Sequence, residues 1–210
     1  GCGVIPAGTG QTEMQVQAMA ALRPDTYVGT PSFLRIIIEK ARESGADISS
    51  VQQALLGAEA LPESLRSWFK ENGVPHVFQT YASADIGSIA YETATGGVLD
   101  PGMVLDEEVL LEIVRPGTGD LVSPGDIGEV VVTLFNDDYP LIRFATGDLS
   151  ALLLGELPGV RTNSRIKGWM GRADQTTKVR AMFVHASQVQ NIVRRHPEIV
   201  KARLVVSGRM

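Results

Sequence analysis

Apolar strands and amphipathic helices alternate through the first part of the sequence, and this pattern restricts the fold more than any other feature. Strands are predicted at 27–29, 51–56 and 74–79, and helices at 31–44 and 62–72. Strands that alternate with helices form a parallel sheet covered by helices. Ligands bind such sheets beyond the carboxyl ends of the strands. We therefore expect an α/β fold with a partial parallel sheet and a ligand site at the strand ends.

The helix that follows the first of these strands carries clear boundary signals. Thr30 is a residue type that caps a first turn, Pro31 stands at the first helical position, and Gly45 follows the last turn. The apolar residues of this segment share one helical face: Phe33, Leu34, Ile37, Ile38 and Ala41.

The N-terminal residues combine an apolar segment, a glycine-rich turn and a helix. Val4–Ala7 is expected to be a brief strand, and Thr12 and Gln15 have the spacing of a capping box that begins a helix over 12–22. A glycine-rich turn before a helix can bind phosphate on free backbone amides. Because no lysine follows in the pattern of a phosphate-binding loop, a simple strand–turn–helix corner is favoured.

Two short segments follow predicted strands and are therefore expected at the ligand-binding edge of the sheet. The first is Gly57-Ala58-Glu59. The second comprises Tyr81, Ala82, Ser83, Ala84 and Asp85. The position of Tyr81 beyond the end of its strand favours contact with a ligand, whereas the alternative is a core aromatic residue at the strand end.

From about residue 98, short strands separated by Pro- and Gly-rich turns replace the alternation. Strands are predicted at 109–114, 128–133 and 141–144. They indicate a small antiparallel β-barrel or sheet. A helix at 186–196 and a strand at 202–206 are typical of the start of a third, α+β unit that the chain does not finish. The expected domains are therefore residues 1–97, 98–170 and 171–210.

The segment Tyr139–Leu149 reads as an apolar strand that runs into a Thr-Gly-Asp turn. Gly147 permits a sharp turn and a close approach to a ligand. Asp148 then places a carboxylate at the strand end, where it can accept hydrogen bonds from two neighbouring ribose hydroxyls. Alternatively, Asp148 hydrogen-bonds its own turn, and this motif alone does not decide between the two.

The composition excludes several classes of protein. The 210 residues are 44% hydrophobic and carry a formal charge of −5, which favours a globular protein and disfavours a general nucleic-acid binder. Cys2 is the only cysteine, so no disulfide within the chain is possible, and we expect a cytoplasmic location. No leader and no apolar run of membrane-spanning length is recognised, so no membrane partner is expected.

Basic residues gather in the segment 161–180, where only Asp174 opposes them. They are Arg161, Arg165, Lys167, Arg172, Lys178 and Arg180. Such a patch suits anionic ligands such as phosphates, and the alternative is a solvated surface run. The three histidines lack metal-ligand spacing and are interpreted as structural or exposed.

Several motifs in a fixed order reveal a family resemblance. They are Gly57-Ala58-Glu59, Tyr81–Asp85, Phe144–Asp148 and Gly171–Lys178, with added support from Val28–Leu34 and Arg165–Gly168. In this order the chain resembles the adenylate-forming enzymes, most closely the phenylacetate–coenzyme A ligase branch, over nearly its whole length. The resemblance implies a ligase that uses ATP and magnesium to convert an aromatic or other small carboxylic acid into an acyl-adenylate. It also implies transfer of the acyl group to coenzyme A.

The resemblance implies roles at the nucleotide for the first-named motifs. Tyr81, with Ala82 and Ser83 beside it, would contact adenine. Gly57, Ala58 and Glu59 would line the adenine and acyl pocket, partly through their backbone. For Glu59, a surface acid at the start of a helix is an equally good interpretation.

Further roles fall on the charged residues. Asp148 would hold the ribose hydroxyls, and Arg172 would contact nucleotide hydroxyls or phosphate. Asp174 would be the hinge of a C-terminal lid that begins at residue 171. Lys178 and Arg180 would face the coenzyme A phosphates, although solvated charge is an equally good interpretation.

The chain departs from the family pattern at its second motif and at its ends. The family usually has Tyr-Gly-Leu-Ser/Thr-Glu where this chain has Tyr81 to Asp85, so Asp85 would take the place of the magnesium-binding glutamate. Neither the family's phosphate loop nor its distal C-terminal lysine is recognised. We therefore expect a fragment that is inactive alone, and that can self-associate through exposed strand edges.

Two alternatives remain open from the sequence. The acyl group could pass to an amine or to a carrier-protein thiol, since the acceptor is not encoded in these motifs. The chain could also be a non-catalytic nucleotide-binding or interaction module that keeps the fold.

Overall fold

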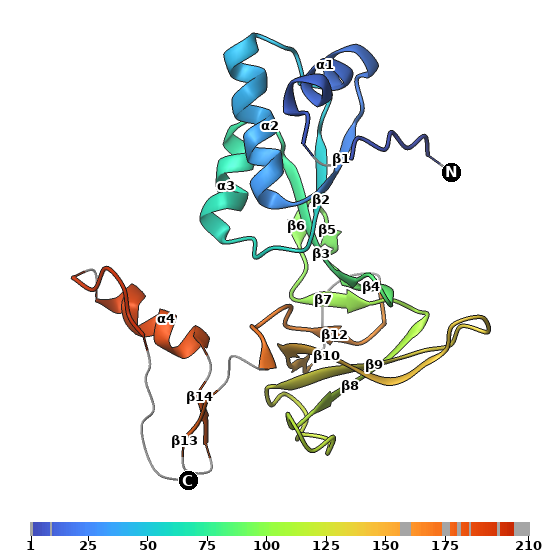
Figure 1. The fold of residues 1–210 in the computed structure, drawn as a ribbon, viewed down its shortest axis with the longest axis vertical. Coiled ribbons are helices and arrows are strands. Elements are labelled where there is room, and N and C mark those ends of the chain that lie inside the picture. The colour runs from blue at the N-terminus through green and yellow to red at the C-terminus, as the bar shows by residue number, and fades with distance from the viewer. Residues whose placement is uncertain are drawn as a thin grey trace. The chain divides into compact units, whose positions relative to one another are not determined.

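The computed structural model describes residues 2–8, 10–155, 161–173, 177–179, 182–184, 186–196 and 198–203 (Figure 1). The chain divides into two compact units, residues 1–82 and 83–210. Among the described residues, no helix is long and apolar enough to cross a membrane. The domain boundaries predicted near residues 97 and 170 stay predictions.

The first unit contains three helices and three parallel strands. In chain order its elements are α1 (Thr12–Leu22), β1 (Thr26–Gly29), α2 (Pro31–Ser44), β2 (Gln53–Leu56), α3 (Glu63–Glu71) and β3 (His76–Ser83). β2 pairs in parallel with both β1 and β3, so Gly29, Leu56 and Gln79 are aligned across the sheet. The predicted alternation of strands and helices around a parallel sheet is confirmed.

α2 begins and ends where its sequence predicts. The Thr30 hydroxyl accepts a hydrogen bond from the Phe33 amide at 3.3 Å, and Gly45 ends the helix in the left-handed conformation at φ 71°. Four residues of the predicted apolar face are buried: Leu34, Ile37, Ile38 and Ala41. They form one core with Val16 of α1, Phe69 of α3 and the buried sides of the strands.

The N-terminal residues differ from the prediction. Val4–Ala7 is exposed and forms no strand. α1 begins at Thr12 as predicted, but the capping box is absent. The side-chain amide of Gln15 instead donates to the carbonyls of Gly8 and Gly10, at 3.2 and 2.8 Å. These bonds satisfy loop carbonyls, so Gln15 ties the glycine turn to the helix.

The second unit contains short antiparallel strands that the sequence did not predict. They are β4 (Gly87–Tyr91), β5 (Ala94–Thr95), β6 (Val98–Leu99), β7 (Met103–Leu105), β11 (Leu152–Leu153) and β12 (Arg165–Ile166). β7 lies between β4 and β12, and β11 pairs with β12. Arg165 is buried here, with its guanidinium 3.6 Å from the Asp100 carboxylate. Hydrogen bonds from Thr93 and Thr95, together with the charge of Arg165, lower the pKa of Asp100.

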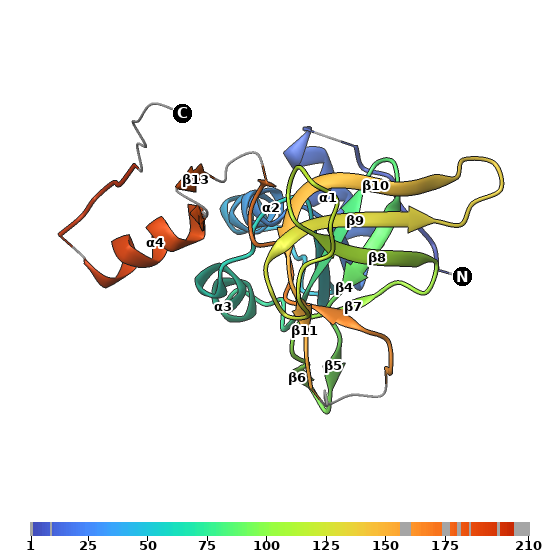
Figure 2. The same cartoon turned by 90° about the horizontal axis from the view of Figure 1, so that it is seen from below.

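Three longer strands form a separate antiparallel sheet in the order β10-β9-β8, as Figure 2 shows. They are β8 (Val109–Val114), β9 (Gly128–Leu134) and β10 (Leu141–Ser150). β8 and β9 lie where strands were predicted, and β10 contains the strand predicted at 141–144. Within the described part of the chain this sheet is open, so the sheet alternative holds and the closed barrel does not.

β10 is longer than predicted. It continues through Thr146, Gly147 and Asp148, where a turn was expected. The register against β9 shifts between Ala145 and Leu149. The glycine therefore forms a bulge inside a strand, because it adopts a φ of 72° while the strand pairs on both sides of it.

The C-terminal residues contain the hairpin of β13 (Thr177–Val179) and β14 (Met182–Val184), followed by α4 (Ala186–Arg195). The predicted helix is confirmed. Residues 202–203 are not in a strand, and the remainder of the predicted strand at 202–206 lies outside the described residues.

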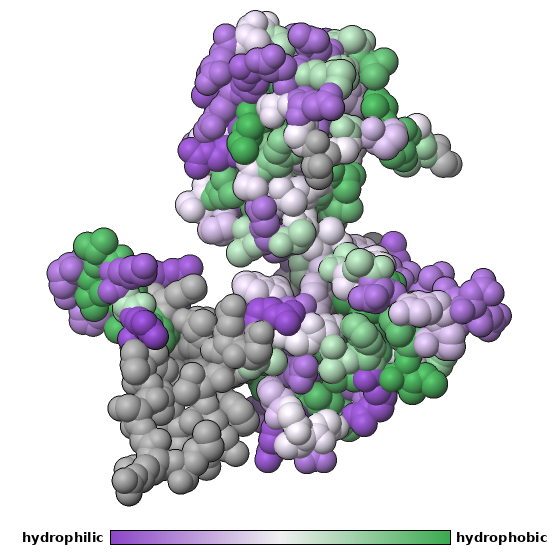
Figure 3. All heavy atoms as spheres, viewed as in Figure 1, coloured by the Kyte–Doolittle hydropathy of each residue, from purple (hydrophilic) through white to green (hydrophobic). Residues whose placement is uncertain are grey.

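The surface mixes polar and apolar side chains (Figure 3). Val28 on β1 is 70% exposed although its strand neighbour Tyr27 is buried. One face of the β1–β2–β3 sheet is therefore packed on the helices, while the other face is open at Val28.

Candidate functional site

The bulge in β10 is fixed by hydrogen bonds on both sides of Gly147. The Thr146 hydroxyl donates to the Val130 carbonyl at 2.9 Å and accepts a bond from the Asp148 amide at 3.1 Å. The Gly147 amide donates to the Glu129 carboxylate at 3.2 Å. Because these bonds join Thr146, Gly147 and the Asp148 amide to β9 or to one another, the backbone at Asp148 is held in a defined position.

The segment that contains Arg172 returns along β10 beside this bulge. The Met170 amide donates to the Leu149 carbonyl, and the Leu149 amide donates to the Gly171 carbonyl, both at 2.8 Å. Asp148 and Arg172 form an antiparallel β-bridge. Two residues that the sequence assigned separately to a nucleotide are thus neighbours in the structure.

The carboxylate of Asp148 is held by side chains from this returning segment. Its Oδ1 accepts hydrogen bonds from the Trp169 indole at 3.0 Å and from Arg172 Nη1 at 3.2 Å. Arg172 Nη1 also donates to the Thr146 carbonyl at 3.1 Å. The Asp148 carboxylate is therefore oriented by two groups that are distant from it in sequence.

Gly147 is favoured by its left-handed backbone conformation, and the Arg172 guanidinium lies close against it. A Cβ atom at this position would lie 2.7 Å from Nη2 of Arg172. The sequence predicted a close approach to a ligand at this glycine, and the structure shows that the Arg172 guanidinium makes the approach. The Arg172 side chain stays 42% exposed and that of Asp148 18%, so the pair forms a charged site accessible from solvent.

In the first unit, the strand ends meet at one edge of the sheet as the topology predicted. The Gly57 amide donates to the Gly29 carbonyl at 3.0 Å. A Cβ atom on Gly57 would lie 3.2 Å from the Thr80 carbonyl, so only a glycine fits comfortably between its neighbours. Ala58 follows in the left-handed conformation at φ 63°. This edge is therefore built mainly from closely spaced backbone.

Glu59 caps α2. Its carboxylate accepts hydrogen bonds from the Ser32 amide at 3.1 Å and from the Ser32 hydroxyl at 2.8 Å, in the first turn of the helix. A carboxylate at this end also interacts favourably with the helix dipole. The geometry favours the structural interpretation of this side chain. Burial, with the nearby charge of Glu59 as a second cause, raises the pKa of Tyr27 to about 12.

The expectation that Tyr81 lies beyond its strand is wrong. β3 continues through Tyr81, Ala82 and Ser83, and the Tyr81 side chain is 8% exposed. The strand ends at Ser83, and a turn at 84–86 leads to Gly87. The role of Tyr81 at an adenine stays a prediction.

Ser83 and Asp85 lie at the end of β3 and in the turn that follows it. The Ser83 hydroxyl accepts a bond from the Ile86 amide at 3.2 Å, and Asp85 is exposed in the turn between them. Within the described ranges, no group of three His, Cys, Asp or Glu side chains could hold a metal ion. One exposed carboxylate still fits magnesium, which is commonly held by one or two carboxylates together with phosphates and waters.

The C-terminal residues are described only in part. Asp174 and Arg180 lie outside the described residues, and Lys178 is described only as a backbone position in β13. The roles predicted for them at a hinge and at coenzyme A stay predictions.

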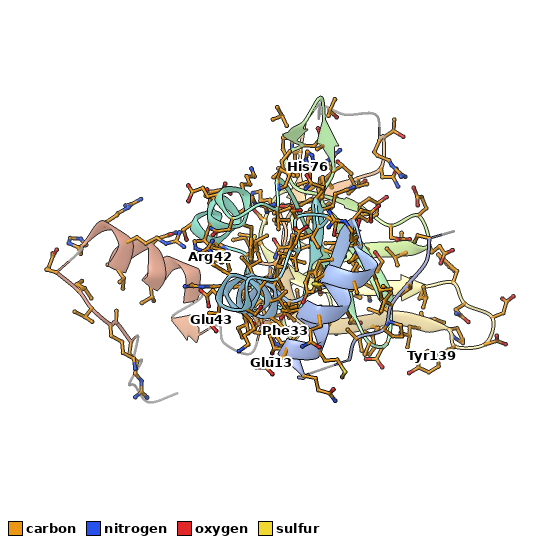
Figure 4. All side chains as sticks on the ribbon, turned by 90° about the horizontal axis from the view of Figure 1, so that it is seen from above. Glu13, Phe33, Arg42, Glu43, His76 and Tyr139 are labelled. Atoms are coloured by element: carbon orange, nitrogen blue, oxygen red, sulfur yellow. The ribbon has the colours of Figure 1, made fainter. Side chains whose placement is uncertain are left out.

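A groove of about 650 Å³ in the first unit contains none of the predicted site residues. It runs along α1 and α2, and Figure 4 shows its rim residues Glu13 and Glu43 on these two helices. Lys40 forms ion pairs with both, at 3.0 and 3.8 Å.

Sequence reasoning missed the contributions of Trp169 and Glu129. Trp169 stands three residues before Arg172, in a segment with glycines on both sides. This closeness to Arg172 was the sequence signal that could have pointed to Trp169 as a site residue. Nothing in the local sequence pairs Glu129 with the bulge, because their contact depends on the register of β9 and β10.

Comparison with known proteins assigns the class of protein. Residues 1–134 match the model of the AMP-binding enzyme family, so the chain belongs to this family. The chain is 26% identical to a phenylacetate-coenzyme A ligase of Aromatoleum evansii, over 98% of this chain and 47% of that protein. It is 29% identical to a phenylacetate-coenzyme A ligase of Thermus thermophilus, over 100% of this chain and 48% of that protein.

Solved structures show the same fold. A 2-hydroxyisobutyryl-CoA ligase, in an open conformation in complex with 2-HIB-AMP and CoA, superposes with a TM-score of 0.76 at 23% identity. The match covers 90% of this chain and 46% of that one. The chain thus spans about half the length of the curated relatives it matches.

Proposed function

We propose that this chain forms part of an ATP-dependent acid–coenzyme A ligase. The complete enzyme joins an aromatic or other small carboxylic acid to AMP and then transfers the acyl group to the thiol of coenzyme A. Membership of the AMP-binding enzyme family and the names of the curated relatives support this assignment. A cytoplasmic location belongs to the same proposal.

The observation that carries the proposal is the oriented carboxylate of Asp148 beside Arg172. A carboxylate is acceptor-only and offers about four lone-pair sites, so it suits the two hydroxyls of a ribose. The guanidinium supplies a rigid set of donors for a phosphate or a hydroxyl. Acceptor and donor are adjacent, 3.2 Å apart, on one partly exposed surface, which supports binding of the hydroxyls and a phosphate of one nucleotide at this place.

The other residues take supporting roles in this proposal. Gly57, Ala58 and Glu59 would contribute backbone to the adenine and acyl pocket, since the Glu59 side chain is engaged with Ser32. Tyr81 would contact adenine, and Asp85 would help to hold magnesium. Lys178 and Arg180 would face coenzyme A, with Asp174 as the hinge.

The reaction requires positioning and charge stabilisation, without a covalent protein intermediate. The acid's carboxylate oxygen attacks the α-phosphorus of ATP, and pyrophosphate leaves. The thiol of coenzyme A then attacks the acyl carbon of the adenylate, and AMP leaves. Magnesium, when bound, supplies positive charge against the phosphates. Asp148 and Arg172 contribute by fixing the nucleotide relative to the acid.

An exchange and product assay on the complete gene product tests this function. With a panel of aryl and short-chain acids, we expect acid-dependent ATP–pyrophosphate exchange, followed by formation of an acyl-CoA. Robust exchange by the 210-residue chain alone would contradict the expectation that the fragment is inactive. Acyl transfer to an amine or a carrier protein, with none to free coenzyme A, would show that the proposed acceptor is wrong. The proposed adenylation step would still stand.

A non-catalytic nucleotide-binding module is a second candidate. It is favoured by the burial of Tyr81 within β3 and by the departures in the segment that ends at Asp85. Nucleotide binding without acid-dependent exchange in the complete gene product would support this candidate against the ligase.

A further inference from the structure

We propose that Trp169 is a positioning residue of the nucleotide site, which holds the Asp148 carboxylate in the orientation that a ribose requires. This inference rests on the proposed function of Asp148. It assigns a role to a side chain that no motif had marked.

The hydrogen bonding of Trp169 distinguishes it from Arg172. An indole has a single N–H donor, and that of Trp169 is directed at Asp148 Oδ1 at 3.0 Å. Arg172 Nη1 carries two N–H groups; it contacts the same oxygen at 3.2 Å and the Thr146 carbonyl at 3.1 Å. The indole is thus the closer of these two donors, and Asp148 Oδ1 is the acceptor of its single N–H.

The backbone around Trp169 is fixed independently of its side chain. Gly168 adopts a φ of 93°, and its carbonyl accepts a bond at 2.8 Å from the buried Ser150 hydroxyl. On the other side, the Met170 amide bonds to the Leu149 carbonyl at 2.8 Å. The indole is therefore presented to Asp148 from a backbone tied to β10 on both sides.

The burial of Trp169 argues against a simple packing role. The residue is 46% exposed, whereas a tryptophan that stabilises a core is largely buried. Its ring therefore contributes less to stability than its size allows. What remains specific to tryptophan here is the N–H donor, which a phenylalanine of similar shape lacks.

A carboxylate that is already held in the bound orientation binds ribose hydroxyls more tightly than one that rotates freely, because less conformational entropy is lost on binding. Without the indole, Asp148 would lose part of its preorganisation, and the bound nucleotide would have to compensate for ordering it. Because a hydrogen bond to a charged group is at the strong end of the range, we expect Trp169→Phe to weaken AMP binding about tenfold.

A double-mutant cycle separates positioning from structural damage. AMP affinity is measured by calorimetry for the parent, Trp169→Phe, Asp148→Ala and the double variant. If Trp169 acts through Asp148, adding Trp169→Phe to the Asp148→Ala variant weakens AMP binding by less than about twofold. Trp169→His restores an aromatic N–H and should recover most of the lost affinity. Trp68→Phe is the matched control, because it removes the other tryptophan of the chain, which packs on Phe69 and Arg35.

Exchange of the indole proton, followed by NMR in the ligand-free chain, tests the contact itself. We expect the Trp169 indole proton to exchange faster in Asp148→Ala than in the parent, and the Trp68 proton to be unchanged. Parent-like AMP affinity in Trp169→Phe, or additive losses in the cycle, would overturn the inference. Failure of the parent to bind AMP would instead count against the proposed function, while the proton exchange would still decide whether Trp169 holds Asp148.

Discussion

Charged side chains have different roles at the strand ends of the first unit and at the bulge of the second unit. At the strand ends, the Glu59 carboxylate caps α2 and Tyr81 is buried within β3. At the bulge, the carboxylate of Asp148 and the guanidinium of Arg172 meet on a surface open to solvent. Each carboxylate accepts two hydrogen bonds, but both donors to Glu59 belong to one residue of a helix turn, whereas Asp148 is held beside a guanidinium that can itself bind a phosphate. The comparison teaches that a motif's carboxylate is a better ligand candidate where the group beside it also suits the ligand.

The largest expected effect concerns Tyr27 in the first unit. Its pKa is raised from 10.0 to about 12, mainly by burial. The folded state therefore holds the phenolic proton more tightly than the unfolded state does. Stability is complete below pH 10 and is lost as the pH rises through about 12, by roughly 3 kcal/mol for two pKa units.

Chemical unfolding of the parent and of Tyr27→Phe between about pH 8 and 12.5 measures this loss. The variant should show a smaller decline. If parent and variant decline in parallel, the buried tyrosine is not the group that titrates.

A substitution at Gly147 should damage both backbone and site. In Gly147→Ala, the left-handed backbone costs about 1–2 kcal/mol, and the new Cβ displaces the Arg172 guanidinium. We expect lower thermal stability together with AMP binding at least about tenfold weaker. Gly117→Ala is the matched control, because Gly117 has a φ of 77° with open space around it. Equal AMP affinity in the two variants would show that the space at Gly147 is not needed for the ligand.

The smallest effect is expected for Glu59→Gln. The variant keeps hydrogen-bond acceptance from Ser32 but loses the charge at the N-terminus of α2, which costs about 0.3–1 kcal/mol of stability. AMP affinity should change little, because only the backbone of Glu59 is proposed to line the pocket. A large loss of AMP affinity with unchanged stability would show that the Glu59 side chain contacts the nucleotide. The charged residues of both regions would then be ligand contacts.

The parts of the fold that local sequence controls could be predicted. The ends of α2 depend on Thr30, Pro31 and Gly45, which lie in or beside the helix, and its buried face follows from the 3.6-residue period. The short strands β4, β7 and β12 escaped prediction because two- to five-residue segments carry little periodic signal. They are specified by their partners in the sheet.

The candidate site could be predicted only in part for the same reason. Asp148 and Arg172 were identified as separate residues of separate motifs, whereas their contact depends on the return of residues 167–172 along β10. The helix cap made by Glu59 spans 27 residues of sequence. The extension of β3 through Tyr81 depends on its neighbours in the fold, so residue type alone did not reveal it.

Calorimetric titration of the chain with AMP, compared between the parent and Asp148→Ala, tests the central claim most directly. Asp137→Ala is the matched control, since Asp137 is an exposed carboxylate in the turn between β9 and β10. We predict that Asp148→Ala weakens AMP binding by at least about tenfold, or 1.4 kcal/mol, and that the control binds like the parent. Parent-like affinity in Asp148→Ala would contradict the placement of the nucleotide at this carboxylate.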